Sequence, residues 1–231
     1  MEEEQAFSKI LSILVKSAII IVGITGIIVT CASTGFMGSG VTFLYFTVQS
    51  NVFAIAVALL FLVDSILRLL GKNPFVMGVM RLVKYTATIA VTVTFLVFAT
   101  MLAPLMGLDY LLSYSNFSLH VIVPILMMFD FLYFDKDVPL NRFTCLWGVV
   151  PALAYFGFFL IGSVTGIRYF NNDFAPYFFL DYQANGWFKV SKSGLGTAYW
   201  FLILLVIIAG LCYLFLLFMN LRRGTFKKRV K

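Results

Sequence analysis

The chain has 231 residues, of which 61% are hydrophobic and only 12% are charged, and its formal net charge is +7. A soluble domain of this length exposes more polar surface than so few polar residues supply, so the composition excludes a soluble globular protein. Most basic residues lie near the ends of apolar runs and at the C-terminus, which argues against nucleic acid as a partner. Because the runs lack the period-2 alternation of a β-barrel, we expect an all-α, polytopic membrane protein.

Six apolar runs are each long enough to cross a hydrocarbon layer of about 30 Å as a helix, which takes roughly 20 residues. The first run follows acidic residues at positions 2–4 and is longer than the apolar core of a signal peptide, so it counts as a span. The sequence predicts one domain, 1–231, built as a bundle of six transmembrane helices at about 10–33, 43–70, 79–104, 117–134, 144–164 and 197–220.

Basic residues are distributed unequally between the two sides of this topology. All but three of the 17 Lys and Arg residues lie on one side, and the exceptions are Arg168, Lys189 and Lys192. Positively charged loops stay in the cytoplasm, so both termini are expected to be cytoplasmic. The basic tail 221–231 anchors this topology, and we expect it to rest against anionic lipid headgroups, which contribute about 1 kcal/mol per basic residue.

The second run opens with polar side chains, in the stretch "YFTVQSN" from Tyr45 to Asn51. Thr47, Ser50 and Asn51 stand at i, i+3 and i+4 and therefore share one helical face, whereas Gln49 points elsewhere. Thr47 lies about one turn inside the external end of this run. Threonine and serine commonly hydrogen-bond between membrane helices, which is the structural interpretation of this face.

Charged residues gather near the cytoplasmic ends of the second, third and fourth runs. Asp64 and Arg68 stand four residues apart on one helical face and can pair. Arg81 and Lys84 begin the third run, and Asp130 lies near the end of the fourth. We interpret these residues as structural ion pairs that hold three helices together, and a proton or cation path is the alternative.

His120 is the only histidine in the chain and lies about one turn inside the external end of the fourth run. The second and fourth runs both cross from outside to inside, so His120 and Thr47 share a depth. If the two faces meet, the imidazole can take the proton of the threonine hydroxyl and convert it into a nucleophile. A single histidine excludes a bis-histidine haem and argues against a His-ligated metal site, so we expect neither metal nor cofactor.

An ester carbonyl under attack also needs hydrogen-bond donors for its oxyanion, and the histidine needs a group that orients it. Asp64 lies about 25 Å from Thr47 along the helix axis, and Asp130 about 15 Å from His120, so neither aspartate orients the histidine. The predicted oxyanion or substrate-binding residues are Gln49, Ser50, Asn51 and Asn116. The orienting residue is left open among Asn116, Asp109, Asp173 and Asp181.

The connection between the fifth and sixth runs, 165–196, is the loop long enough to fold over a site. It is rich in aromatic residues, which favour the membrane–water interface. A belt of aromatic side chains at the membrane surface explains why the loop is aromatic. Only a role as a lid or binding element explains why the loop is so long. We therefore predict an external loop that covers the polar residues of the second and fourth runs.

Three segments resemble the family of androgen-induced and androgen-dependent integral membrane proteins: "YFTVQSN" at 45–51, "LHVIVPILMMFDFLYFD" at 119–135, and "PYFFLD" with the later "GW". Animal members of that family are six-helix hydrolases that cleave esters between two fatty acids with an intramembrane threonine and histidine. Thr47 stands at the family threonine in a T-x-x-S-N context, and His120 stands at the family histidine, four residues before Pro124. "PYFFLD" is similar to the bacterial branch, so a bacterial plasma membrane is the expected location.

The resemblance implies attack by Thr47 on a lipid ester, with His120 acting as base and then as acid through an acyl-threonine intermediate. It also implies membrane lipids and a fatty-acid ester as partners. The residues leave two alternatives open. One is a small-molecule or ion transporter that uses the inner charged layer, and the other is a non-catalytic lipid-binding membrane protein.

Overall fold

The computed structural model describes residues 2–33, 40–135, 138, 140–191 and 194–229. Six of its helices are long and apolar enough to cross a membrane, which confirms an all-α, multi-pass membrane protein. These spans are Ala6–Ala32, Phe46–Leu69, Gly78–Leu105, Tyr114–Phe134, Thr144–Val164 and Thr197–Arg223.

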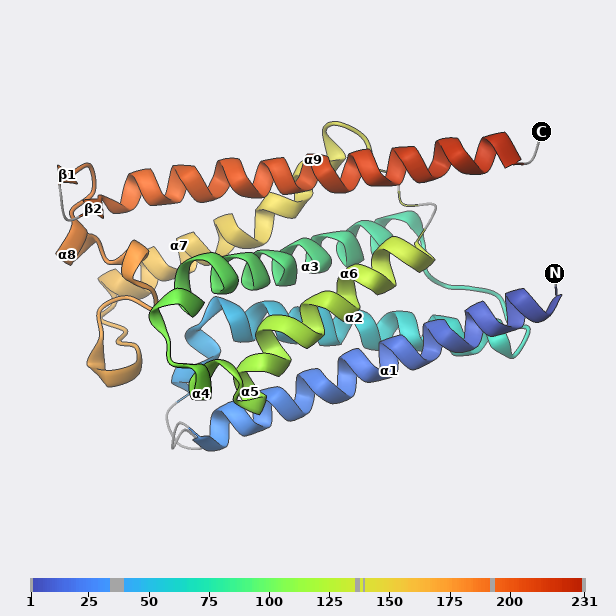
Figure 1. Ribbon diagram of the computed structural model, residues 1–231, viewed down its shortest axis with the longest axis horizontal. Coiled ribbons are helices and arrows are strands. Elements are labelled where there is room, and N and C mark those ends of the chain that lie inside the picture. The colour runs from blue at the N-terminus through green and yellow to red at the C-terminus, as the bar shows by residue number, and fades with distance from the viewer. Residues whose placement is uncertain (1, 34–39, 136–137, 139, 192–193, 230–231) are drawn as a thin grey trace.

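The long helices run side by side along the long axis of the molecule (Figure 1). α1 begins and α9 ends at the same end of the bundle, which we call the inner end, and the loop 165–196 lies at the opposite, outer end (Figure 1). α1, α2, α3 and α6 contact one another in a closed arrangement, and α7 and α9 pack against α3. In chain order the long helices are α1 (Glu2–Ser33), α2 (Phe46–Leu69), α3 (Gly78–Val97), α6 (Val123–Phe134), α7 (Val150–Val164, after a 3-10 segment Thr144–Val149) and α9 (Thr197–Arg229).

The second span begins later than the predicted boundary at residue 43. Val41–Leu44 forms a 3-10 turn, Tyr45 is extended with φ −87° and ψ 138°, and α2 starts at Phe46. Thr47 therefore lies in the first turn of α2, and not one turn inside a helix that has already begun. The main-chain N–H groups of Val48 and Gln49 both donate to the carbonyl of Tyr45 at 3.1 Å, so the residue before α2 closes its first turn.

Two spans contain a π-helical turn near the outer end. One follows α3 at Phe98–Leu102, and the other, Ser118–Ile122, joins α5 to α6. Pro124 has no N–H to donate to the carbonyl of His120 four residues earlier, so the regular α-helical bond is missing there. π turns occur mostly as single turns inside α-helices and are frequent at functional sites. The short elements nearby are the 3-10 turn Ala103–Leu105, α4 (Leu108–Leu111) and α5 (Tyr114–Phe117).

α1 comes close to the π turn of the fourth span at Gly26. A Cβ added at Gly26 would lie 2.3 Å from Ser118 Oγ and 2.9 Å from Leu119 Cδ2. Small residues let membrane helices approach each other closely. Gly26 thus allows α1 to support the turn that carries His120. The core below this contact is apolar and includes Ile19, Ala54, Ala58, Val91, Val123 and Met127.

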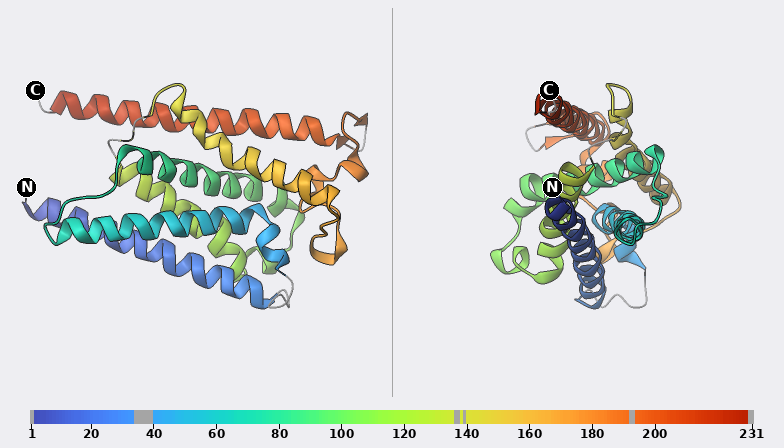
Figure 2. Two further views of the ribbon diagram at one scale, coloured as in Figure 1. Left: turned by 180° about the vertical axis from the view of Figure 1, so that it is seen from behind. Right: turned by 90° about the vertical axis from the view of Figure 1, so that its right-hand side faces the viewer.

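The described residues of the loop 165–196 are folded and cover the outer start of α2, and a role of the loop as a lid stays a prediction. The Tyr45 ring makes edge contacts with Tyr169 and Tyr177, at centroid distances of 5.7 and 6.1 Å. The Tyr45 hydroxyl accepts a hydrogen bond of 3.1 Å from the main chain of Phe170. The loop contains the 3-10 turns Phe170–Asn172 and Phe178–Leu180, α8 (Tyr182–Asn185), and a hairpin of β1 (Val190–Ser191) and β2 (Gly194–Leu195) (Figure 2).

The predicted tail 221–231 continues α9 as a helix as far as Arg229. Arg222 Nη2 donates a hydrogen bond of 2.6 Å to the carbonyl of Tyr133, and Arg223 donates to the carbonyl of Val138. The first basic residues of the tail therefore contact protein. The side chains after Arg223 lie outside the described part of the chain, as does Lys192, so contact of the tail with lipid headgroups stays a prediction.

Candidate active site

Thr47 and His120 lie within hydrogen-bonding distance of each other near the outer end of the bundle. Thr47 Oγ1 is 3.1 Å from His120 Nε2. Thr47 comes from the first turn of α2, and His120 comes from the π turn Ser118–Ile122. Both side chains are half-buried. The proximity expected from their shared membrane depth is therefore present, and their role in catalysis stays a prediction.

The other ring nitrogen of His120 fixes which tautomer faces the threonine. Nδ1 is 3.0 Å from the main-chain carbonyl of Asn116, four residues earlier. A carbonyl oxygen only accepts hydrogen bonds, so Nδ1 carries the proton and Nε2 is left as the acceptor for the Thr47 hydroxyl. The buried Phe98 ring stacks on the imidazole, with centroids 4.2 Å apart and an interplanar angle of 27°. The hydrogen bond of Nδ1 thus fixes the imidazole within its plane, and the Phe98 ring packs against its face.

The orienting group differs from three of the four predicted alternatives. Asp109 and Asp173 are exposed. Asp181 caps α8, where its Oδ1 accepts hydrogen bonds from the main-chain N–H groups of Gln183 and Ala184 at 3.0 and 2.9 Å. Asn116 is the alternative that contacts His120, although it does so through its main chain. A main-chain contact of this kind leaves no signal in the residue type.

The polar face of α2 is present, but its donors bind protein groups. Asn51 Nδ2 donates to the carbonyl of Thr47 at 2.7 Å and to the carbonyl of Leu119 at 3.0 Å. Ser50 Oγ donates to the Thr47 carbonyl at 3.0 Å and lies 2.8 Å from Thr94 Oγ1 of α3. These bonds connect α2 to α3 and to the turn that carries His120. Asn51 and Ser50 are therefore positioning residues in this structure, which corrects the predicted oxyanion role.

The two remaining predicted oxyanion donors are also engaged. Gln49 Nε2 donates to the carbonyl of Phe43 at 2.9 Å. Asn116 Nδ2 donates to the carbonyl of Tyr110 at 3.2 Å. Gln49 thus closes the preceding 3-10 turn, and the Asn116 side chain ties its own helix to α4. Each amide uses one of its two N–H donors in this way, and the oxyanion role of Gln49 and Asn116 stays a prediction.

Tyr177, in the loop 165–196, is a site residue that sequence reasoning missed. Burial raises the pKa of its hydroxyl to about 12, although hydrogen bonding with the side chain and main chain of Thr47 opposes this rise. The hydroxyl therefore keeps its proton at neutral pH and can donate it in a hydrogen bond. The signal in the sequence was its place in "PYFFLD", next to a loop already expected to act as a cover.

A cavity of about 470 Å³ lies beside the Thr47–His120 pair, and Phe98, Asn116 and Tyr177 also line it. This volume falls in the range of roughly 300–1,000 Å³ that is usual for small-molecule sites. A second cavity, of about 70 Å³, also reaches Thr47 and Tyr177. Its other walls are apolar side chains of α3, α7, α9 and the loop, among them Val97, Phe156, Phe179, Phe201 and Leu204.

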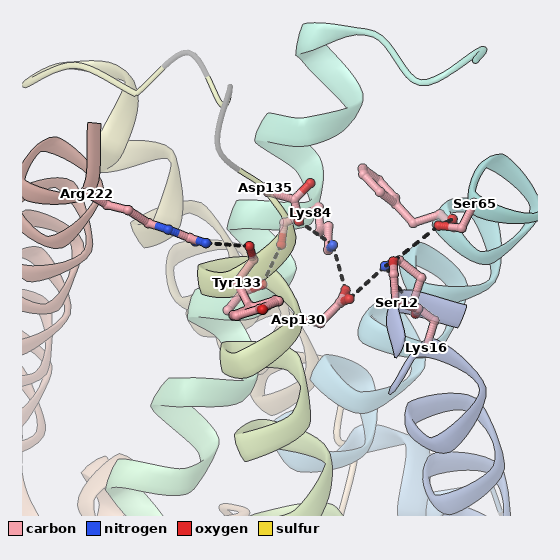
Figure 3. Close-up of polar contacts among 10 residues, drawn as sticks. Ser12, Lys16, Ser65, Lys84, Asp130, Tyr133, Asp135 and Arg222 are labelled. Atoms are coloured by element: carbon pink, nitrogen blue, oxygen red, sulfur yellow. Dashed lines mark hydrogen bonds and ion pairs between the residues drawn. The ribbon is translucent and has the colours of Figure 1, made fainter. Parts of the chain in front are cut away.

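The inner end of the bundle holds the predicted ion pairs. Arg68 Nε donates to Asp64 at 2.6 Å within α2. Lys84 of α3 pairs with Asp130 of α6 at 2.6 Å, and Lys16 of α1 pairs with the other oxygen of Asp130 at 2.7 Å. Figure 3 shows the two lysines on either side of this carboxylate.

Lys16 was not among the predicted ion-pair residues. A single lysine inside the first apolar run was the signal for it, because a charge in a membrane span is costly unless it is paired. Lys84 also pairs with Asp135. Arg81, the remaining predicted member, lines a cavity next to this network.

No group of three or more His, Cys, Asp or Glu side chains is arranged to hold a metal ion within the described part of the chain. Comparisons with protein families, characterised proteins and solved structures give no match. The interpretation of the site therefore depends on its own geometry.

Proposed function

We propose that this protein is an intramembrane hydrolase of fatty-acid esters that uses Thr47 as the nucleophile and His120 as the base. The observation that supports it most strongly is the 3.1 Å contact between Thr47 Oγ1 and His120 Nε2, with Nδ1 bound to the Asn116 carbonyl. A hydroxyl becomes a useful nucleophile only when a base is in reach of its proton and that base is itself oriented. Both conditions are met beside a cavity of about 470 Å³.

In the first half of the reaction, Thr47 Oγ1 attacks the ester carbonyl carbon while His120 Nε2 takes the hydroxyl proton. The tetrahedral intermediate collapses when the bond to the alcohol oxygen breaks. His120 returns the proton to that oxygen, so the alcohol leaves as a neutral molecule. The acyl group remains as an ester of Thr47.

In the second half, a water molecule takes the place of the alcohol. His120 Nε2 removes one proton of the water as its oxygen attacks the acyl-threonine carbonyl. The bond to Thr47 Oγ1 breaks, and the proton on His120 passes to that oxygen. The free fatty acid leaves, and the threonine hydroxyl and neutral imidazole are regenerated.

Tyr177 is the side chain best suited to stabilise the oxyanion. It lines both cavities together with Thr47, and its raised pKa keeps its hydroxyl protonated. A donor fixed where negative charge develops contributes more to the transition state than to the bound substrate. Because Tyr177 belongs to the covering loop, docking of the loop would complete the site.

The walls of the two cavities support an apolar ester as the substrate. Thr47 borders both cavities, so the two halves of an ester can lie in different cavities with the carbonyl at Thr47. Esters between two fatty acids, the substrate class of the family that the sequence resembles, have this shape. We include membrane lipids as partners and a bacterial plasma membrane as the location in the same proposal.

The transporter alternative gains no support from the cavities. The outer cavity and the inner cavity among the charged residues share no lining residue. A non-catalytic lipid-binding protein would use the same apolar walls, but it would not need an oriented base on the threonine. A measurement of ester turnover distinguishes the hydrolase from the non-catalytic lipid-binding protein.

Turnover tests the proposal directly. The full chain in detergent micelles is given an ester of a hydroxy fatty acid, and release of the free acid is followed by mass spectrometry. Thr47→Ala and His120→Ala should each lower kcat by about 10³-fold or more, since members of a catalytic pair act as a unit. Thr86→Ala is the matched control, because the Thr86 hydroxyl bonds only its own helix, at Leu82. Equal turnover in wild type and Thr47→Ala would exclude the proposal.

A further inference from the structure

The cavities of about 470 and 70 Å³ that meet at Thr47 differ in their relation to His120. We call them the wide cavity and the narrow cavity. Among the residues that the structure describes, Thr47, Leu102 and Tyr177 line both cavities, whereas His120 lines only the wide one. The two halves of an ester bound at Thr47 are therefore in unequal positions, because only one cavity lies on the side of the base.

The chemistry of ester hydrolysis requires the alcohol half to lie on that side. His120 Nε2 passes its proton to the alcohol oxygen as the bond to the acyl carbon breaks, and it later deprotonates the water that replaces the alcohol. A general acid or base acts only within hydrogen-bonding reach of its partner atom. The alcohol and the water therefore use the wide cavity. The acyl half, which stays bonded to Thr47 Oγ1, is left with the narrow one.

The narrow cavity extends from Thr47 along one face of α9. The α9 residues that line it stand at i, i+3, i+4 and i+7, and they are Phe201, Leu204, Leu205 and Ile208. Seven residues separate the first from the last, so this face is about 10 Å long at 1.5 Å per residue. The Phe201 ring stacks on Phe156 of α7, with centroids 3.9 Å apart. Aromatic contact thus joins α7 and α9 along the cavity.

The deep end of the narrow cavity is formed by Ala152, Val93 and Ile208. Ala152 belongs to the first turn of α7, the end of that helix farther from the covering loop. It packs against the apolar cluster that contains Val93 of α3 and Ile208 of α9. The other two side chains are β-branched and larger. Ala152 is therefore the position where a larger side chain would shorten the cavity.

The hydroxyl groups in the walls of the narrow cavity beyond its mouth already have partners. Tyr155 donates to the carbonyl of Leu44 at 3.0 Å. Thr94 Oγ1 lies 2.8 Å from Ser50 Oγ and donates to the carbonyl of Ala90 at 3.3 Å. Engaged groups of this kind have little capacity to bind water or a polar substituent, and the surrounding walls are apolar. The narrow cavity therefore suits an alkyl chain.

The two cavities also differ in size and polarity. One water-sized group occupies roughly 10–15 Å³ of such a space, so the narrow cavity holds about five to seven of them. A methylene group is similar in size to water, which limits the narrow cavity to an acyl chain of medium length. The wide cavity is several times larger, and hydroxyl groups of Thr42, Tyr110 and Ser115 line it. It can accept a long alcohol half as well as water.

We propose that the narrow cavity binds the acyl half of the ester and limits its length, while the wide cavity binds the alcohol half and admits water. This assignment rests on the proposed hydrolysis at Thr47. Ala152 is the specificity-determining residue, because its small side chain leaves the deep end open to the end of the acyl chain.

A pair of isomeric esters tests the assignment on the full chain in detergent micelles. Octyl hexadecanoate carries its long chain in the acyl half, and hexadecyl octanoate carries it in the alcohol half, so the two esters partition into micelles alike. Wild type should hydrolyse hexadecyl octanoate with a kcat/KM about tenfold or more above that of octyl hexadecanoate, because only the acyl cavity is short. Equal values, or the reverse order, overturn the assignment.

Replacing Ala152 with phenylalanine tests the deep end. Ala152→Phe should raise the preference for octyl butanoate over octyl octanoate by about tenfold or more, since the longer acyl chain loses its space. Ala154→Phe is the matched control, because Ala154 is exposed on the same helix and is not among the residues that line the cavity. A folded Ala152→Phe variant with the wild-type preference overturns the role of Ala152.

If Ala152→Phe does not fold, Ile208→Ala decides by a change in the opposite direction. It enlarges the deep end and should improve the hydrolysis of octyl hexadecanoate relative to hexadecyl octanoate, whereas Ile207→Ala, at an exposed position of α9, should not. Turnover that depends on Thr47 but shows no such change overturns this assignment alone. Turnover that survives Thr47→Ala, or no turnover of any ester, excludes the proposed function as well.

Discussion

Asn51 of α2 donates a hydrogen bond of 3.0 Å to the carbonyl of Leu119, the residue directly before His120. The same amide group donates to the carbonyl of Thr47, four residues before Asn51. One fully buried side chain therefore ties the helix that carries the proposed nucleophile to the turn that carries the proposed base. The distance between Thr47 and His120 depends on this link.

Replacing Asn51 with alanine should lower kcat by more than it raises KM, because substrate contacts remain while the pair separates. The Leu119 carbonyl loses the Asn51 donor, while the Thr47 carbonyl keeps the Ser50 hydroxyl, and such a loss costs about 1–3 kcal/mol of unfolding free energy. The measurements are steady-state turnover and the thermal unfolding midpoint in detergent. Thr88→Ala is a matched buried control that removes a hydroxyl bonded only within α3. If Asn51→Ala lost stability but kept the wild-type kcat, Asn51 would be structural and nothing more.

Replacing Tyr177 with phenylalanine tests the proposed oxyanion donor. Loss of one such donor in other enzymes costs about 10²–10³ in kcat, and a similar loss is expected here with KM nearly unchanged. Burial raises the pKa of Tyr177 to about 12, so wild type should show no loss of activity from ionisation of this tyrosine at any pH well below that value. Tyr182→Phe is the control in the same loop, since its hydroxyl donates to Ser163 instead. A kcat loss no larger than that of Tyr182→Phe would rule out this role.

Replacing Gly26 with alanine should move the turn that carries His120. The new Cβ overlaps Ser118 Oγ and Leu119 Cδ2, and an overpacked core usually loses about 1–3 kcal/mol of stability. Turnover should fall together with the unfolding midpoint. Gly210→Ala in α9 is the control, because a Cβ there meets nothing within 4 Å. Wild-type activity in Gly26→Ala would show that the turn tolerates displacement.

Replacing Asp130 with asparagine should destabilise the protein without acting on the ester site. Lys16 would lose its carboxylate partner and Lys84 would lose one of two, and breaking a buried ion pair on one side typically costs about 3–5 kcal/mol. The measurement is the unfolding free energy in a denaturant titration, with Asp109→Asn as an exposed control. A stability change as small as that of the control would mean that the two lysines find other partners.

The membrane spans, and the depth of Thr47 and His120 in them, could be predicted from features of single segments of the sequence. Runs of apolar residues define helices of membrane length whatever their neighbours are, and both Thr47 and His120 could be counted from the outer ends of their runs. The pairing of Asp64 with Arg68 follows from four-residue spacing alone. These features depend on distance along one helix, which the sequence records directly.

Features that depend on contacts between distant segments were not predictable in the same way. α2 begins at Phe46 because Tyr45 leaves the helix and packs its ring on Tyr169 and Tyr177 of the loop. The donors of Asn51 and Ser50 turn to carbonyls and a hydroxyl that only the folded bundle brings near. Polar residue types thus indicated a polar site correctly, but they did not reveal which groups each one binds.

If Thr47 is the nucleophile, it becomes covalently acylated during turnover, and residue-resolved labelling with an acyl-like electrophile reports on this reactivity. The full chain is treated with a fluorophosphonate that carries a fatty-acyl tail, and the modified peptide is identified by mass spectrometry. The assignment of Thr47 as the nucleophile predicts a phosphonyl adduct on Thr47 that is absent in Thr47→Ala, strongly reduced in His120→Ala, and unchanged in Thr86→Ala. An adduct on another residue, or labelling that persists in Thr47→Ala, would contradict it.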